Sequence, residues 1–267
     1  MARPFTKMHG LGNDFVVFDA RKDALSLSSA QVRALCNRRT GIGCDQLFVM
    51  EPSQRADVFM RIYNADGGEV AACGNGARCI ARLVGEGAET VRIETLAGVI
   101  EGTADGAGAA LDMGAPRFGW EDIPLAYAMD TADMPVGWGE LERPASVNVG
   151  NPHVVFFVPD ADAVPLETLG PEIETDALFP EKVNVGVAEI RSRTDIKLRV
   201  WERGAGLTEA CGIGACAAAI CAMRRKLTDR SVTVELPGGT LKIEWRDDDH
   251  ILMTGPAEIA FTGEVDL

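Results

Sequence analysis

Apolar and polar positions along the first half of the chain predict short strands and two helices. The extended pattern over residues 5–19 is broken at Gly10, Leu11 and Gly12, and residues 58–63 alternate as a half-buried strand does. Ser28 and Gln31 are spaced as a capping pair for a short helix that runs through Asn37. The other elements expected here are a helix over residues 74–84 and strands over residues 46–51, 91–93, 98–102 and 109–113.

The second half predicts the same order of elements. Residues 215–226 are strongly helical because they are rich in alanine and end in Met223, Arg224, Arg225 and Lys226. A further helix is expected over residues 161–169, and strands over residues 147–158, 183–190, 195–201, 232–236, 240–245 and 251–253. Residues 259–265 form a last strand, which could pair with either half.

The two halves also share sequence at one constant offset. Cys73-Gly74-Asn75-Gly76-Ala77 matches Cys211-Gly212-Ile213-Gly214-Ala215, 138 residues later. Residues 12–18 match residues 150–156 at the same offset, and Gln46 falls on Asn184. Several matches in one register indicate a duplicated fold.

We therefore predict an α+β fold of two pseudo-symmetric β-rich halves, each wrapped around a central helix. Gly114-Ala115-Pro116 marks the boundary between a first domain, residues 1–115, and a second domain, residues 116–256. Residues 257–267 are a C-terminal strand that could rejoin the first domain. The expected active site is the cleft between the halves, where each half would present one thiol to the same carbon.

Composition excludes several classes of function. A formal charge of −14 and a pI near 4.7 argue against nucleic acid as a partner, because phosphates require a basic surface. The longest apolar run, residues 154–158, is too short to span a membrane, and the N-terminal residues lack a signal-peptide pattern, so we expect a cytoplasmic protein. An odd number of cysteines without a CxxC motif, and three scattered histidines, favour neither disulfides nor a bound metal.

The two repeated cysteines carry the candidate chemistry. Each precedes a glycine-rich helix start, where backbone N–H groups have no partner within the helix and attract anions. Such a position stabilises a thiolate, so we expect the pKa of both thiols to fall toward neutrality. The other helical cysteines have the spacing of small buried apolar residues: Cys36, Cys79, Cys216 and Cys221. A redox pair is the competing use of Cys73 and Cys211.

Several motifs of the chain resemble those of the diaminopimelate epimerase family. In the first half they are Met8-His9-Gly10-Leu11-Gly12-Asn13-Asp14-Phe15, Gly43-Cys44-Asp45-Gln46, Asn64-Ala65-Asp66-Gly67 and Cys73-Gly74-Asn75-Gly76-Ala77-Arg78-Cys79. In the second half they are Gly150-Asn151-Pro152-His153, Asn184-Val185-Gly186, Glu202-Arg203-Gly204 and Ala210-Cys211-Gly212. The resemblance implies an epimerase, without cofactor and as a homodimer, that converts LL-diaminopimelate to the meso form for lysine and peptidoglycan precursors.

The resemblance also implies a role for each matching residue. Cys211 would accept the proton from the LL substrate and Cys73 would donate one to the opposite face. The reacting carboxylate would be held by the backbone amides of Gly74, Asn75, Gly212 and Ile213. The distal carboxylate and amine would be bound by Asn64, Asn151, Asn184 and Arg203. The reacting end would be lined by Asn13, Gln46 and Glu202, with His153 supporting catalysis nearby.

The chain departs from the family pattern at two positions. Residue 213 is commonly Thr and here is Ile213, and Glu209 replaces a more usual apolar residue; we expect Glu209 to point to solvent. Two other functions remain open: a proline or hydroxyproline racemase-like enzyme of the same fold, and a thiol redox or binding protein with a degenerate site. Arg203 and the several amide side chains favour a longer substrate with a second charged end.

Overall fold

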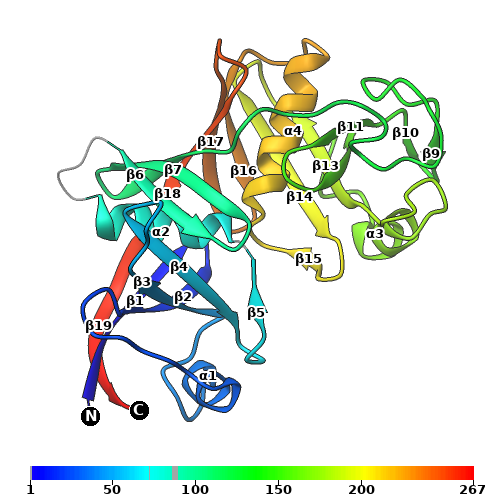
Figure 1. Ribbon diagram of the computed structural model, residues 1–267. Helices are drawn as coiled ribbons and strands as arrows, with labels where there is room; N and C mark the ends of the chain where they lie inside the picture. The colour runs from blue at the N-terminus through cyan, green and yellow to red at the C-terminus, as the bar shows by residue number, and fades with distance from the viewer. Residues whose placement is uncertain (1, 72, 86–89) are drawn as a thin grey trace. The chain divides into compact units, whose positions relative to one another are not determined.

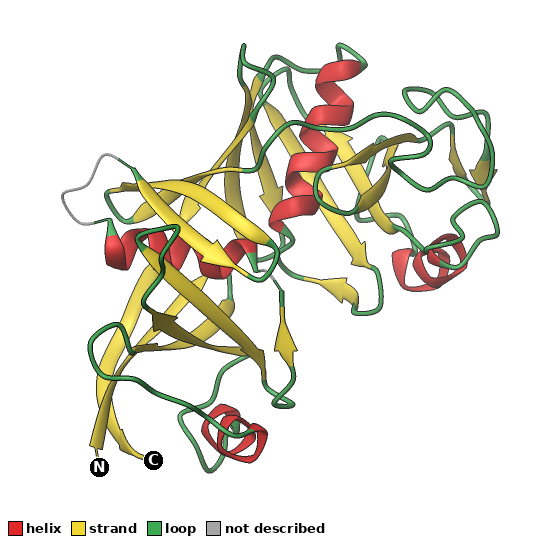
Figure 2. Ribbon diagram, in the orientation of Figure 1, coloured by secondary structure: helices red, strands yellow, loops and turns green. Residues whose placement is uncertain are grey.

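The computed structural model describes residues 2–71, 73–85 and 90–267, and the chain folds into two compact units (Figure 1). Unit 1 comprises Met1–Asp112 and Thr254–Leu267, and unit 2 comprises Met113–Met253. Both units are mixed β-sheets with few helices (Figure 2). The α+β fold expected from the sequence is therefore confirmed.

Unit 1 is a mixed sheet built around helix α2 (Gly74–Val84). The helix packs against strands β1, β4, β6, β7 and β8, and one face of it, including Ala77, Ile80 and Ala81, is fully buried. A short helix, α1 (Ser29–Cys36), begins with the expected Ser28–Gln31 capping box. The strands are β1 (Ala2–Gly10), β2 (Asn13–Asp19), β3 (Gln46–Glu51), β4 (Val58–Asn64), β5 (Glu69–Val70), β6 (Val91–Thr95), β7 (Gly98–Asp105), β8 (Gly108–Asp112) and β19 (Glu258–Asp266).

Unit 2 repeats this plan around helix α4 (Gly212–Arg224), which packs against β11, β12, β13, β14, β16 and β17. Helix α3 (Leu166–Glu174) lies against β13, β14 and β15. The strands are β9 (Gly137–Trp138), β10 (Leu141–Glu142), β11 (Ala145–Asn148), β12 (Pro152–Phe157), β13 (Asn184–Ile190), β14 (Asp195–Glu202), β15 (Gly206–Thr208), β16 (Ser231–Leu236) and β17 (Gly239–Trp245). Strand β18 (Ile251–Pro256) carries the chain from unit 2 back to unit 1.

The strand register carries the same 138-residue repeat as the sequence. In unit 1 the parallel pair β2–β3 places Phe15 opposite Gln46. In unit 2 the parallel pair β12–β13 places His153 opposite Asn184, the residues 138 positions later. The helices α2 and α4 likewise begin at Gly74 and Gly212. The duplication inferred from the sequence is therefore confirmed in the fold of each unit.

Two expected elements differ from the structure, and the pairing of a third, left open from the sequence, is settled. The strand expected over residues 147–158 is wrong: β11 and β12 form an antiparallel pair separated by a turn, in which Asn148 Oδ1 accepts the N–H of Gly150. The helix expected over residues 161–169 instead runs from Leu166 to Glu174, because Pro165 occupies its N-cap. The last strand, β19, pairs antiparallel with β1 in unit 1.

The apolar core is divided between the units. In unit 1 a buried cluster gathers around Val16, Phe18 and Leu47, and in unit 2 another gathers around Phe156 and Val185. These clusters pack against the parallel strand pairs β2–β3 and β12–β13, whose ends carry the candidate site. In the parts of the chain that the structure describes, no helix combines the length and apolarity that crossing a membrane requires.

Candidate active site

Cys73 is the N-cap residue of α2, a position that Ser, Thr, Asp or Asn usually fills. Its backbone is extended, and its Sγ accepts the N–H of Gly76 at 3.3 Å, as a capping hydroxyl would. The N–H groups of Gly74 and Asn75, the first two residues of the helix, have no partner within the helix. The thiol and these two donors therefore lie at one helix end, where an anion is favoured.

The ends of three neighbouring strands gather the amide side chains predicted for unit 1. Asn13 begins β2, Gln46 begins β3, and Asn64 ends β4, directly opposite Gln46 in the antiparallel register. Gln46 Nε2 donates to Asn64 Oδ1 at 2.9 Å, and Asn75 Nδ2 donates to Asn13 Oδ1 at 3.3 Å. The second of these bonds connects the sheet edge to the helix that follows Cys73.

A cluster of ion pairs fixes the two loops that carry these amides. Asp14 is bound by Lys7 Nζ at 2.6 Å and by Arg38 Nη2 at 2.6 Å, and its carbonyl accepts the N–H of Asp45. Burial alone would raise the pKa of Asp14, but the hydrogen bonds from Arg38 and Lys7 outweigh it and hold this pKa well below its usual range. The Asp14 carboxylate thus remains charged. Its backbone hydrogen bond with Asp45 holds the start of β2 beside the start of β3.

Cys211 occupies the equivalent position in unit 2. It is the N-cap of α4, and its Sγ accepts the N–H of Gly214 at 3.3 Å. The expected fall of its pKa is wrong: burial, followed by the nearby Glu202 carboxylate, raises the pKa of the Cys211 thiol well above its ordinary value. The N–H of Gly214 acts in the opposite direction but is outweighed. The resting state of Cys211 is therefore the thiol.

The loop after β14 brings three predicted residues of unit 2 together. Glu202, which ends β14, is within hydrogen-bonding reach of the Cys211 thiol. Its Oε1 accepts a hydrogen bond from the hydroxyl of Thr208 at 2.6 Å. The backbone N–H of Arg203 donates to Asn184 Oδ1 at 2.9 Å, while Asn184 Nδ2 donates to the carbonyl of Pro152 at 2.8 Å. Asn184 is almost fully buried and joins the loop that carries Arg203 to the start of β12.

The Arg203 side chain lies at the surface of unit 2. One guanidinium nitrogen, Nη1, donates to the carbonyl of Glu181 at 2.9 Å, which orients the group. The side chain is exposed, so its remaining donors face solvent and are available to a carboxylate.

His153 is completely enclosed within unit 2. Its Nε2 lies 2.8 Å from Asn151 Oδ1, and its Nδ1 is buried without a hydrogen-bond partner among the described residues. Burial, reinforced by the charge of Arg203, lowers the pKa of His153 to about 3. Because an amide oxygen only accepts, the neutral ring carries its proton on Nε2 and donates to Asn151.

The remaining predicted positions behave as follows. Ile213 is the second residue of α4 and is half-buried, and Glu209 is exposed as expected. The pKa of Cys79 and that of Cys221 are each raised to about 12, mainly by burial, which suits inert core thiols. Cys36 and Cys216 are likewise buried.

Two residues connected to the site were not singled out from the sequence. Arg78 is fully buried in α2, and its Nη2 donates to Asn75 Oδ1 at 3.1 Å. Asp45 accepts the side-chain amide of Asn13 at 3.0 Å. A signal existed for Arg78, because a charged residue one helical turn after Asn75, within a run of buried positions, requires buried polar partners.

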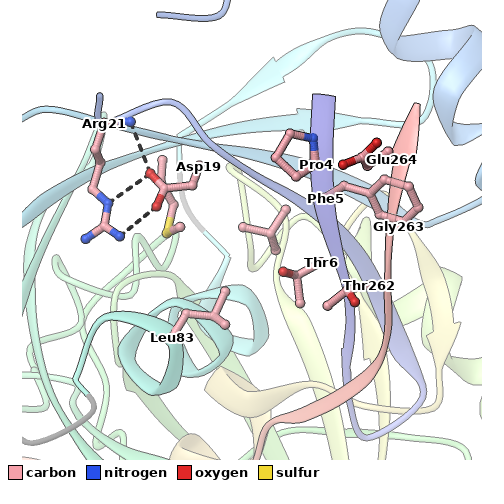
Figure 3. A pocket seen from close by; sticks show the side chains of 11 residues that line it. Pro4, Phe5, Thr6, Asp19, Arg21, Leu83, Thr262, Gly263 and Glu264 are labelled. Atoms are coloured by element: carbon pink, nitrogen blue, oxygen red, sulfur yellow. Dashed lines mark hydrogen bonds and ion pairs between the residues drawn. The ribbon is translucent and has the colours of Figure 1, made fainter. Parts of the chain in front are cut away.

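The structure also contains a cavity of ≈ 460 Å³ in unit 1, drawn in Figure 3. It is lined by residues of β1, β2, β3, α2 and β19, and the Asp19–Arg21 ion pair lies at its side. None of the predicted site residues lines this cavity, and no catalytic grouping lines it either. We therefore assign the candidate chemistry to the helix starts at Cys73 and Cys211.

Known proteins resemble this chain along nearly its whole length. The family model described as diaminopimelate epimerase matches residues 5–119 and 145–260. The diaminopimelate epimerase of Erythrobacter litoralis is 64% identical over 263 residues, covering 98% of this chain and 97% of the relative. That of Rhizorhabdus wittichii is 59% identical, covering 98% and 95%.

Solved structures share the fold at low sequence identity. A phenazine biosynthesis protein of the PhzF family from Bacillus anthracis is 16% identical with a TM-score of 0.69, and each chain is fully covered. A hydroxyproline epimerase from Agrobacterium vitis is 13% identical with a TM-score of 0.65, covering 100% of this chain and 93% of the other. At such identities the likeness concerns the fold alone, whereas the family match rests on sequence. This chain belongs to the diaminopimelate epimerase family.

Proposed function

We propose that the protein epimerises LL-diaminopimelate to meso-diaminopimelate by acid–base catalysis with two thiols and no cofactor, in the supply of lysine and peptidoglycan precursors. One observation carries the proposal beyond family membership. Each unit presents a cysteine as the N-cap of an equivalent helix, with Sγ accepting the N–H of the third helical residue. An inversion needs a base on one face of the carbon and an acid on the other, and a duplicated fold supplies one such group from each half.

The proton inventory begins with both cysteines as thiols. As substrate binds, Glu202 takes the proton of Cys211, and the resulting thiolate removes the α-proton. Cys73 donates its proton to the opposite face of the carbon, which leaves a Cys73 thiolate and a protonated Glu202. Proton exchange with solvent then restores the resting state. The raised pKa of Cys211 supports this order, because its thiolate, once formed, is a stronger base than an ordinary one.

The α-proton is weakly acidic, so the carboxylate must be stabilised as negative charge develops on it. We propose that the N–H groups of Gly74, Asn75, Gly212 and Ile213 perform this function. Backbone donors at a helix start are fixed in advance, and one such donor contributes roughly 10²–10³ in rate. Ile213 would act through its backbone N–H, so the loss of a hydroxyl there would leave this contact intact.

The two ends of the substrate require different partners. For the distal end we propose Arg203 as the carboxylate ligand, supported by Asn64 and Asn151, because its guanidinium is exposed and its backbone is held by Asn184. Asn13, Gln46 and Glu202 would line the reacting end. His153 would support catalysis by orienting Asn151, since its low pKa keeps the ring neutral. These assignments draw on both domains proposed from the sequence, residues 1–115 and 116–256.

Deuterium incorporation tests the proposal. Purified protein and LL-diaminopimelate in D₂O should yield meso product labelled at one α-carbon, without added pyridoxal phosphate or metal and in the presence of a chelator. Cys73→Ala and Cys211→Ala should each abolish net epimerisation. Cys79→Ala and Cys221→Ala are matched controls, because each removes a buried thiol from the same helix as one catalytic cysteine. Near-normal turnover by either catalytic variant would refute the two-thiol mechanism.

We also propose a cytoplasmic homodimer. Strand β19 supports the dimer, because it is exposed along most of its length and carries the exposed apolar side chains Ile259 and Phe261. Phe261→Glu should then shift the molar mass measured by light scattering from dimer to monomer. An unchanged mass would exclude β19 as the interface.

A further inference from the structure

Four side chains of unit 1 form a continuous chain of hydrogen bonds. Arg78 Nη2 donates to Asn75 Oδ1 at 3.1 Å, Asn75 Nδ2 donates to Asn13 Oδ1 at 3.3 Å, and Asn13 Nδ2 donates to Asp45 Oδ2 at 3.0 Å. The chain joins α2 to the starts of β2 and β3. Its buried end is Arg78, which is 0% exposed, and its exposed end is Asp45.

The two ends of this chain determine its direction. A guanidinium only donates hydrogen bonds and a carboxylate only accepts them, whereas an asparagine amide does both. Arg78 therefore requires the amide oxygen of Asn75 on its side, and Asp45 requires the amide nitrogen of Asn13. Turning either amide over would set two donors or two acceptors against each other. The orientation of both amides thus follows from the residues at the ends.

Both ends are themselves held in place. Arg78 Nε donates to the carbonyl of Pro256 at 3.3 Å. A Cβ added to Gly10 would lie 3.2 Å from Arg78 Nη2, so the guanidinium fits here because residue 10 has no side chain. At the other end, Asp45 Oδ1 accepts from Arg38 at 2.7 Å, and Asp45 Oδ2 also accepts the N–H of Asp14 at 3.2 Å.

This direction decides what the asparagines offer a ligand. Each amide oxygen already accepts a bond within the chain, while each amide nitrogen uses one N–H and keeps a second. Asn13 and Asn75 consequently present donors beside the helix start that follows Cys73. Donors suit a carboxylate and are poorly matched to an ammonium group, which has only donors of its own.

We infer that Arg78 and Asp45 are positioning residues, which orient the amides of Asn13 and Asn75 as donors for the reacting carboxylate. The inference rests on the proposed function, since it assigns the carboxylate of that substrate to these amides. It also gives a specific expectation. Either end alone still imposes the direction, so the ends are redundant, and only the loss of both frees the amides to reverse.

A double-mutant cycle on kcat/KM tests this redundancy. Asp45→Ala and Arg78→Met should each reduce kcat/KM several-fold. In the double variant, kcat/KM should fall roughly tenfold further than the product of the two single reductions. That factor is about what one hydrogen bond to a charged group contributes. In the Asp45→Ala background, Arg78→Lys keeps a donor at this position and should retain most of the activity that Arg78→Met loses. Arg38→Ala is the control partner for Arg78→Met, because it removes the ion pair of Asp45 but leaves the amide chain intact.

Each result decides the question. A purely structural role for Arg78 predicts losses that follow the thermal midpoint and multiply with Asp45→Ala, and this outcome would overturn the inference. If Arg78→Met does not fold, Gly10→Ala replaces it in the cycle, because its added Cβ crowds Nη2. Wild-type protein that fails to epimerise diaminopimelate would overturn the proposed function and this inference together, whereas active protein with multiplicative losses would overturn this inference alone.

Discussion

The burial of His153 predicts that unit 2 loses stability as the pH falls from 7 to 5. The folded pKa is about 3, whereas the ordinary value is 6.5. Below pH 6.5 the unfolded chain binds a proton at this histidine and the folded chain does not, so unfolding becomes easier. The neutral ring contributes fully to the free energy of unfolding at a pH above the unfolded pKa. This contribution is lost progressively as the pH falls toward the folded pKa.

The magnitude follows from the difference in proton binding. The difference approaches one proton only below the unfolded pKa of 6.5, so roughly 1.5 of the two pH units count fully, which gives a loss of about 2 kcal/mol in the free energy of unfolding between pH 7 and pH 5. The contacts of the ring explain why it stays neutral. Its Nε2–H is already used by Asn151, and protonation would bury a second N–H on Nδ1, which has no partner among the described residues.

Urea unfolding followed by tryptophan fluorescence measures this loss directly. All four tryptophans lie in unit 2, so the signal reports on the unit that contains His153. His153→Gln is the matched variant, because its side-chain amide can still donate to Asn151 but does not titrate. The wild type should lose about 2 kcal/mol more than this variant between pH 7 and pH 5. Equal losses, or a His153 ring resonance that titrates near pH 6.5, would refute the reasoning.

Two further predictions concern the site. Arg203→Ala should raise KM with kcat nearly unchanged, because its proposed partner is the distal carboxylate; a fall in kcat at constant KM would contradict that role. Gly76→Ala should reduce the free energy of unfolding by about 1–3 kcal/mol, because the new Cβ would lie 2.3 Å from the buried Phe48 ring; unchanged urea unfolding would show that the ring moves aside.

Local sequence signals predicted the elements that carry the site. The helix expected over residues 74–84 matches α2, because a glycine-rich start after Cys73 leads into a clear apolar periodicity. The repeat at an offset of 138 residues also predicted the equivalence of Gln46 and Asn184, which the parallel strand pairs confirm. Such features depend on residues close together in sequence and were therefore accessible.

Features that depend on tertiary contacts were not accessible. The turn at Gly150 is a different case, because Asn148 and the run Gly150-Asn151-Pro152 are a local turn signal that the strand expected over residues 147–158 overlooked. The direction of the pKa shift at Cys211 depends on its burial and on Glu202, nine residues earlier in the chain, and these outweigh the helix start. Arg78 has one partner in β18 and another in its own helix, and the spacing of α2 alone does not reveal the first.

The duplication explains how one scaffold supports two different chemical environments. Asn64 ends β4 opposite Gln46, and Glu202 ends β14 at the equivalent position, 138 residues later. Unit 1 therefore places a neutral amide where unit 2 places a carboxylate, and the carboxylate is the stronger base of the two. We infer that divergence at this single position makes Cys211 the thiol whose proton is taken within its own unit as substrate binds. Exchanging the two side chains, by Asn64→Glu together with Glu202→Asn, should reverse that asymmetry and reduce turnover even though both cysteines remain.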